Sequence, residues 1–100
     1  MDKKEKFDLI SGASSVHDSP ETIKNLFGKD FAIDERDENN RTPLMYSAMW
    51  GSPSVMKFLL EKGADKTLKD NSGLSTSELV KSSGFPRDED KKKMLKLLKK

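Results

Sequence analysis

A chain of 100 residues suits one domain, which at this size buries roughly 60 to 70% of the surface of the unfolded chain. Charged side chains make up 36% of it and the net charge is only +2, yet its aliphatic residues recur periodically, which indicates a folded chain. Without cysteine it has no disulfides or thiolate metal sites, and without a signal-peptide pattern or a long apolar run we predict a cytoplasmic protein without a membrane segment.

The first predicted elements are two short helices near the N-terminus. The apolar set of the first one is Phe7, Leu9, Ile10 and Ala13. The second is predicted over residues 20–27, because Ser19 suits an N-cap and Pro20 suits the first helical turn, where a missing N–H costs nothing.

The next predicted helix begins with Thr42 and Pro43, which follow the same start rule. Its inward positions are Leu44, Ser47 and Ala48. Small side chains there would let a neighbouring helix approach closely, and Gly51 ends the helix. The preceding stretch "IDERDENN" is rich in Asp and Asn, which support turns.

A fourth helix is predicted to begin with Ser52 and Pro53. One of its faces carries Val55, Met56, Leu59 and Leu60. We expect Met56 in the core, since its repeat partner is Ile23 and both lie on the inward face. Gly63 suits the left-handed position that follows a helix C-terminus.

The last predicted pair of helices is less regular. Asp70 and Gly73 open its turn, but Thr76 and Ser77 stand where the previous unit has Pro-Leu. Its second helix is shifted by about five residues after a longer loop, "GFPRDED". The apolar set of that helix is Met94, Leu95, Leu97 and Leu98.

The chain matches itself at a shift of 33 residues. Residues 19–29 read "SPETIKNLFGK" and residues 52–62 read "SPSVMKFLLEK", and the same shift relates Asp37 to Asp70. The repeating unit is therefore a turn followed by two short helices.

The stretch "DENNRTPLMYSAMWGSPSVMKFLLEKGAD" resembles an ankyrin repeat. The matching positions are Asp37, Thr42, Pro43, Leu44, Ala48, Gly51, Leu59, Leu60, Gly63 and Ala64. Asn40 replaces the turn glycine, which is tolerable because Asn visits the left-handed region. The resemblance implies an all-α solenoid of about three helix-turn-helix units in one domain, residues 1–100. The approximate repeats are 4–36, 37–69 and 70–100, and the outer two are degenerate caps.

Ankyrin-like domains usually perform no chemistry and bind a partner protein through turn tips and the exposed side of each first helix. The resemblance therefore implies a protein–protein interaction module: an adaptor, scaffold or inhibitor. Carried over by position, its partner-binding residues are Glu38, Asn39, Arg41, Met49, Trp50, Lys69, Asn71, Ser72 and Leu74. Arg41 and Trp50 are the expected anchors, because Arg and Trp are enriched among interface hot spots. The alternative for Trp50 is packing against the neighbouring repeat or over the end of its own helix.

No pattern favours catalysis, a cofactor or a metal. His17 is the only histidine, so a zinc or catalytic site lacks further ligands. The acidic residues within 34–38 lack the ligand spacing, central glycine and closing glutamate of an EF-hand loop. We predict no enzymatic activity, no cofactor and no metal site.

The lysine-rich end supports an alternative function, binding of nucleic acid or another polyanion. Residues 1–50 carry net −3 and residues 51–100 net +5, and six of the last ten residues are lysine. The simpler interpretation is a solvated helix face, since Asp88, Glu89 and Asp90 at its start and lysines at its end complement the helix dipole. Self-association through an exposed cap is an open alternative that we do not predict.

Overall fold

The computed structural model describes residues 33–84 and 86–99. In these ranges the chain forms four helices: α3 (Pro43–Trp50), α4 (Pro53–Glu61), α5 (Thr76–Ser82) and α6 (Asp88–Leu98). The described residues form no strand, only an isolated antiparallel bridge between Lys69 and Ser75. The predicted all-α fold is confirmed.

The predicted helices of the first unit, together with Ile23 and His17, lie outside the described residues. The hairpin α3–α4 falls within the predicted repeat 37–69, and α5–α6 falls within 70–100. In the described part of the chain, no helix has the length and apolar character needed to span a bilayer.

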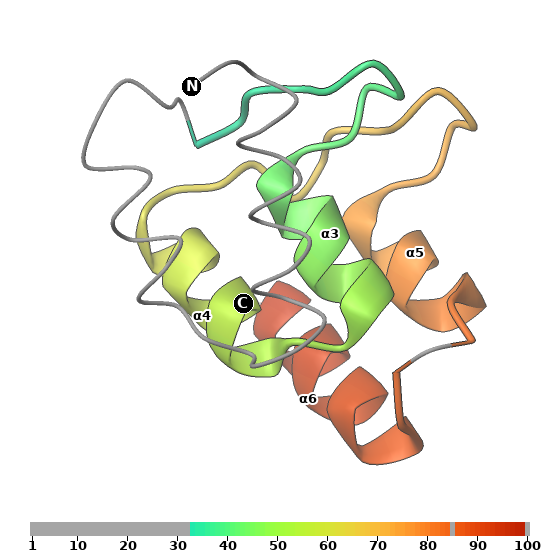
Figure 1. Cartoon of the computed structure of the whole chain (residues 1–100). Coiled ribbons are helices and arrows are strands. Elements are labelled where there is room, and N and C mark those ends of the chain that lie inside the picture. The colour runs from blue at the N-terminus through green and yellow to red at the C-terminus, as the bar shows by residue number, and fades with distance from the viewer. Residues whose placement is uncertain (1–32, 85, 100) are drawn as a thin grey trace.

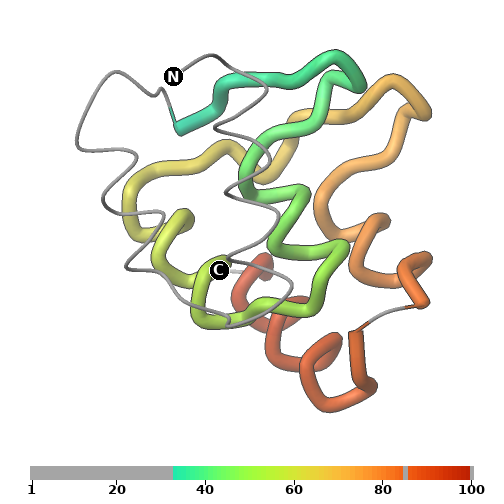
Figure 2. The backbone as a smooth tube through the Cα atoms, viewed as in Figure 1, coloured from blue at the N-terminus to red at the C-terminus, as the bar shows by residue number. Residues whose placement is uncertain are grey.

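The four helices pack as two hairpins placed side by side. Helix α3 contacts α4 and α5, while α6 contacts α4 and α5. The first helices, α3 and α5, therefore form one layer and the second helices, α4 and α6, form the other (Figure 1). The turns that precede α3 and α5 lie next to each other at one end of the stack (Figure 2).

Helices α3, α4 and α5 each follow a hydroxyl-bearing N-cap residue, as the sequence predicts for α3 and α4. The Thr42 side chain accepts a hydrogen bond from the Met45 N–H, and Ser75 forms a reciprocal capping box with Glu78. Ser52 occupies the N-cap of α4, but its side chain makes no capping bond and the helix relies on Pro53 in its first turn.

The ends of α3 and α4 use the left-handed backbone that their glycines allow. Gly51 has φ +70° and Gly63 has φ +92°. After α4, the Gly63 N–H donates to the Leu60 carbonyl and the Ala64 N–H to the Leu59 carbonyl, which is a Schellman pattern. Both predicted helix stops are therefore confirmed.

The core lies between the two helix layers. Met56, predicted as a core residue, is fully buried. Each such side chain removed from water contributes roughly 2 kcal/mol before entropic costs. The buried apolar residues are Leu44, Met45, Ala48, Val55, Met56, Leu59, Ala64, Leu79, Val80, Met94 and Leu98.

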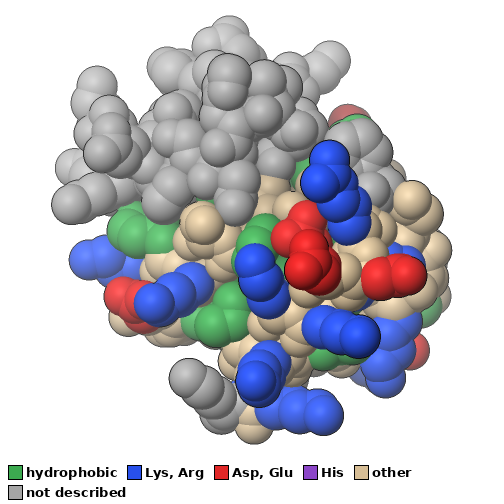
Figure 3. All heavy atoms as spheres, turned by 90° about the horizontal axis from the view of Figure 1, so that it is seen from below, with side chains coloured by type: hydrophobic (Ala, Val, Ile, Leu, Met, Phe, Trp, Pro, Cys, Tyr) green, Lys and Arg blue, Asp and Glu red, His purple; other side chains and the backbone are tan. Residues whose placement is uncertain are grey.

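Helix α6 begins inside the stretch that the sequence assigns to a loop. The first turn of α6 holds Asp88, Glu89 and Asp90, as the dipole argument expects. Met94 and Leu98 are buried, whereas most α6 lysines are exposed. Figure 3 shows Lys and Arg side chains gathered beside hydrophobic ones on the face seen from below.

The loop before α6 also packs on the end of α3. A Cβ placed on Gly51 would lie 3.0 Å from both Cα and Cβ of Pro86. The Ser83 hydroxyl donates to the Met49 carbonyl at 2.8 Å. The longer loop of the last unit therefore closes over the C-terminal end of the neighbouring first helix.

Candidate functional site

The turn before α3 is organised by a single carboxylate. Asp37 Oδ1 accepts hydrogen bonds from the backbone N–H groups of Asn39 and Arg41, both at 2.9 Å. The Asn40 N–H donates to the Asp37 carbonyl, and Asn40 has φ +63°, the left-handed conformation expected from its place in the motif. The side chain of Asp37 thus fixes the backbone of the whole turn.

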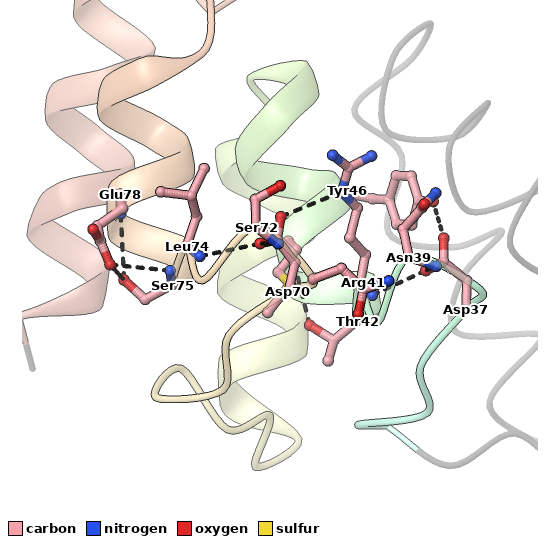
Figure 4. Close-up of polar contacts among 12 residues, drawn as sticks. Asp37, Asn39, Arg41, Thr42, Tyr46, Asp70, Ser72, Leu74, Ser75 and Glu78 are labelled. Carbon is pink, nitrogen blue, oxygen red and sulfur yellow. Dashed lines mark hydrogen bonds and ion pairs between the residues drawn. The ribbon is translucent and has the colours of Figure 1, made fainter.

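Thirty-three residues later, Asp70 organises the next turn in the same way. Asp70 Oδ1 accepts from the N–H groups of Ser72 and Leu74, at 2.9 and 3.0 Å. The Gly73 N–H donates to the Asp70 carbonyl, and Gly73 has φ +77° at the position equivalent to Asn40. The sequence repeat is therefore also a repeat of hydrogen-bond geometry (Figure 4).

The two turns are tied directly to each other. The Asn71 N–H donates to the Asn39 carbonyl at 3.0 Å, and the Asn71 side-chain amide donates to the Glu38 carbonyl at 3.2 Å. One loop upstream, the Asp65 N–H donates to Asp34 Oδ1 at 2.8 Å. The turn tips consequently form one connected surface instead of two independent loops.

The second oxygen of each aspartate has a different partner. Asp37 Oδ2 accepts a hydrogen bond from the hydroxyl of Tyr46. Burial raises the pKa of Tyr46 well above its usual range, and the hydrogen bond to Asp37 and the charge of that carboxylate raise it further. Tyr46 therefore stays protonated and keeps its donor at neutral pH.

Asp70 Oδ2 instead faces Arg41, whose Nε lies 3.5 Å away. The Asp70 side chain is 1% exposed and that of Arg41 is 28% exposed. A carboxylate this deeply buried needs a compensating cation, so the ion pair joins the middle repeat to the last one (Figure 4). Arg41 thus has a structural role that the sequence did not predict.

Five of the predicted partner-binding residues form the exposed part of this turn surface. The side chains of Glu38 and Asn39 come from the turn before α3, and the others come from the turn before α5. These exposed residues are Glu38, Asn39, Lys69, Asn71 and Ser72. Their backbone is fixed by the aspartate network, while their side chains reach solvent.

The remaining predicted residues are less accessible. Met49 and Leu74 are partly buried and pack against the core. Trp50 is half-buried at the end of α3, and its indole Nε1 is shielded from solvent. Any partner that touches Trp50 would therefore meet ring carbons and not the indole N–H.

Two hollows on the other side of the molecule were missed by sequence reasoning. The larger, of about 570 Å³, is bounded by α4, the loop after it and Leu97 of α6, and the smaller, of about 350 Å³, lies between α4 and α6. Both are lined by Lys57 and Leu97. The shared face of two helices depends on how the hairpins stack, so a single-helix pattern could not identify it. Within the described part of the chain, no group of His, Asp and Glu side chains is arranged to hold a metal ion.

The chain resembles a known family model and solved structures. A family model for "Ankyrin repeats (3 copies)" matches residues 9–73.

A chain in the structure of the Bd0816 predatory endopeptidase from Bdellovibrio bacteriovorus in complex with immunity protein Bd3460 superposes with a TM-score of 0.72. The two are 24% identical, and the match covers 91% of this chain and 45% of that one. The human ASB11 ankyrin repeat domain gives a TM-score of 0.68 at 18% identity, covering 88% of this chain and 38% of that one. These structures support the fold.

Curated relatives match shorter segments. The human NAD-capped RNA hydrolase NUDT12 is 36% identical over 53 residues, 53% of this chain and 12% of that protein. The probable palmitoyltransferase AKR2 of Saccharomyces uvarum is 46% identical over 55 residues, 55% of this chain and 8% of that protein. The putative ankyrin repeat protein L271 of Acanthamoeba polyphaga mimivirus is 32% identical over 71 residues, 71% of this chain and 10% of that protein. The chain thus covers only 8 to 12% of the length of these relatives.

Proposed function

This chain belongs to the ankyrin repeat family, whose repeats generally mediate protein–protein interaction and are typically non-enzymatic, and from that premise we propose a cytoplasmic adaptor, scaffold or inhibitor. Its partner is another protein. The chain binds that partner through the turn tips, the partly exposed C-terminal end of α3 and the exposed side of α5.

The observation that carries this proposal is the preorganised turn surface. Asp37 and Asp70 hold the backbone of two successive turns, and Asn71 links one turn to the other. A turn backbone that is already fixed loses little further conformational freedom on binding, which favours affinity.

The anchors of the surface can be ranked from their surroundings. Trp50 is half-buried and can still contribute ring area to an interface, whereas the Nε of Arg41 already faces Asp70. We therefore propose Trp50 as the main anchor at the far end of α3. The polar contacts come from the exposed turn residues, and Arg41 serves chiefly to hold the turns.

The test separates the turn surface from the rest of the molecule. A charge-exchange variant, Glu38→Arg with Lys69→Glu, changes two exposed turn side chains and leaves the net charge unchanged. The matched control, Glu89→Arg with Lys92→Glu, does the same on exposed positions of α6. Both are compared with the unmodified chain in affinity purification, followed by titration of the purified partner.

We expect a partner protein to be retained by the unmodified chain and by the α6 control. The turn variant should lose this partner. Trp50→Ala should also weaken the titrated affinity, by about tenfold or more for a hot-spot residue. A partner whose affinity is unaffected by both the turn variant and Trp50→Ala would place the binding site elsewhere.

A further inference from the structure

The two hollows beside α4 and α6 are adjacent to each other. Both are lined by Lys57 of α4 and Leu97 of α6, so the larger one, of about 570 Å³, is adjacent to the smaller one, of about 350 Å³. The larger hollow adds the apolar side chains of Leu60 and Ala64. The smaller is lined by Pro53, Ser54, Lys57, Lys93, Lys96 and Leu97. We call the whole feature the α4–α6 groove.

The smaller end of the groove combines positive charge with an apolar wall. Lys57, Lys93 and Lys96 contribute three ammonium groups from two helices, and among the described residues no acidic side chain lines this end. Pro53 and Leu97 supply apolar surface between them.

The larger end is more mixed in charge but keeps its apolar lining. Glu61 and Asp65 lie there, together with Lys66, whose Nζ donates to the Leu98 carbonyl at 2.7 Å. Asp65 Oδ1 accepts a hydrogen bond from the Thr67 N–H, so this carboxylate stabilises the turn that contains it. The electrostatic preference of the groove is therefore set by its lysine-rich end.

We propose that the α4–α6 groove docks an acidic peptide segment of a partner protein, with carboxylates over the three lysines and an apolar side chain against Leu97. Charge complementarity favours an acidic occupant, and the apolar wall favours one with leucine-like side chains. Nucleic acid fits less well, because the described residues that line the groove include no aromatic side chain on which a base could stack.

This site lies on the opposite layer from the surface proposed above. The turn surface belongs to α3, α5 and their turns, whereas the groove belongs to α4 and α6. Figure 3 shows Lys and Arg side chains gathered beside hydrophobic ones on the face seen from below, the side on which α4 begins in Figure 1. The groove therefore adds a second interaction surface, and its proposal stands whether or not the turn surface is correct.

Fluorescence anisotropy with the full chain and labelled synthetic probes tests the proposal. The main probe is a peptide in which glutamate and leucine residues alternate, and the comparison probes are a polyglutamate of equal charge and a single-stranded oligonucleotide. Measurements at low ionic strength are needed, since exposed charges are screened over about 10 Å at 0.1 M salt. The expected order of affinity is the glutamate–leucine peptide, then polyglutamate, then the oligonucleotide.

Charge-reversal variants locate the site. Lys93→Glu with Lys96→Glu should weaken binding of the glutamate–leucine peptide by about tenfold, and Lys57→Glu on α4 by roughly threefold. The charge-matched control is Lys92→Glu with Lys99→Glu, two exposed lysines of the same region that do not line the groove. Far-ultraviolet circular dichroism confirms that each variant is folded.

Four results would overturn the proposal. Absence of peptide binding at low salt removes it. Equal losses of peptide affinity in the groove variant and its control would show that the peptide is held by the general positive charge of the lysine-rich end and not by the groove. If the oligonucleotide binds more tightly than the peptide, and its binding depends on Lys93 and Lys96 in the same way, the occupant of the groove is nucleic acid. If the unmodified chain dimerises in sedimentation and the groove variant does not, the occupant of the groove is a second copy of this chain.

Discussion

Arg41 and Asp70 form an ion pair across the boundary between two repeats, with Arg41 Nε 3.5 Å from Asp70 Oδ2. Asp70 is nearly fully buried and also holds its own turn through Oδ1. The same carboxylate therefore shapes one turn and accepts the cation that comes from the turn before it. The stability of the last repeat should depend on both functions.

Removing the cation should destabilise the chain. We expect Arg41→Ala to lower the free energy of unfolding by about 2 kcal/mol, since it leaves a buried carboxylate without compensation. Urea denaturation measures this, with Lys92→Ala, at an exposed position, as the control. The same change in an Asp70→Asn background should cost much less, because no charge remains to compensate. Equal costs in the two backgrounds would contradict a pairwise interaction.

Gly51 should be far more sensitive to substitution than Gly63. Both have positive φ, so an alanine at either position costs roughly 1 kcal/mol in backbone strain. A methyl group on Gly51 would meet Pro86 at 3.0 Å, whereas none of the described residues comes within 4 Å of one on Gly63. We expect Gly51→Ala to lower the free energy of unfolding by about 1 kcal/mol more than Gly63→Ala. Thermal denaturation of both variants checks this, and equal losses would show that the Pro86 contact relaxes without cost.

The Tyr46 hydroxyl should make stability fall at alkaline pH. Its pKa is raised on folding, so the folded chain binds the phenolic proton more tightly than the unfolded chain, whose tyrosine titrates near 10.0. The contribution of the Tyr46 proton to stability is fully present below pH 10.0 and is lost as the pH rises above it. Tyr46→Phe should cost roughly 1 kcal/mol at neutral pH and flatten the alkaline decline. Unfolding curves of both chains between neutral and alkaline pH test it, and parallel declines would contradict it.

The capping box of α5 gives a test at acid pH. The pKa of Glu78 lies below its usual range because it accepts hydrogen bonds from the backbone and side chain of Ser75. This contribution is therefore present above pH 4.5 and is lost as the pH falls below it. Glu78→Gln should reduce the acid sensitivity of unfolding, which acid titration followed by circular dichroism can show. An unchanged acid limb would mean that the box does not form in solution.

The cap itself can be tested at neutral pH. Ser75→Ala should lower the free energy of unfolding by about 1 kcal/mol, the usual cost of removing an N-cap side chain. Ser72→Ala is the control, because Ser72 is exposed and contributes its backbone N–H to the turn. Similar effects of the two changes in urea denaturation would contradict a specific capping role for Ser75.

Local features of the fold could be predicted from sequence because each depends on nearby residues. The left-handed Asn40, the helix stop at Gly63 and the turn built by Asp37 all follow from the intrinsic preferences of those residue types. The 33-residue repeat then indicated the order of helices. The start of α6 was placed less well, because its apolar set is shifted relative to the repeat.

Features that join different repeats could not be predicted in the same way. Arg41 was assigned to a binding surface from its position in the repeat. Its ion pair with Asp70 could not be predicted, because the distance between the two side chains depends on how two hairpins stack. The packing of Pro86 on Gly51 and the α4–α6 groove depend on the same stacking. Which of the nine predicted binding residues contact a partner stays a prediction, although five of them are exposed on the connected turn surface.

The different partners of the two aspartates make successive repeats chemically unequal. Asp37 already receives the Tyr46 hydroxyl, whereas the Asp70 oxygen at the same position receives a cation from its neighbour. Duplicating residues 37–69 would therefore bring a copy of Arg41 and a second tyrosine to the same carboxylate, whose oxygens have lone pairs for both. Lengthening this protein by copying that segment would therefore give each new junction two donors on one carboxylate, where the present junction between α3–α4 and α5–α6 has only the arginine.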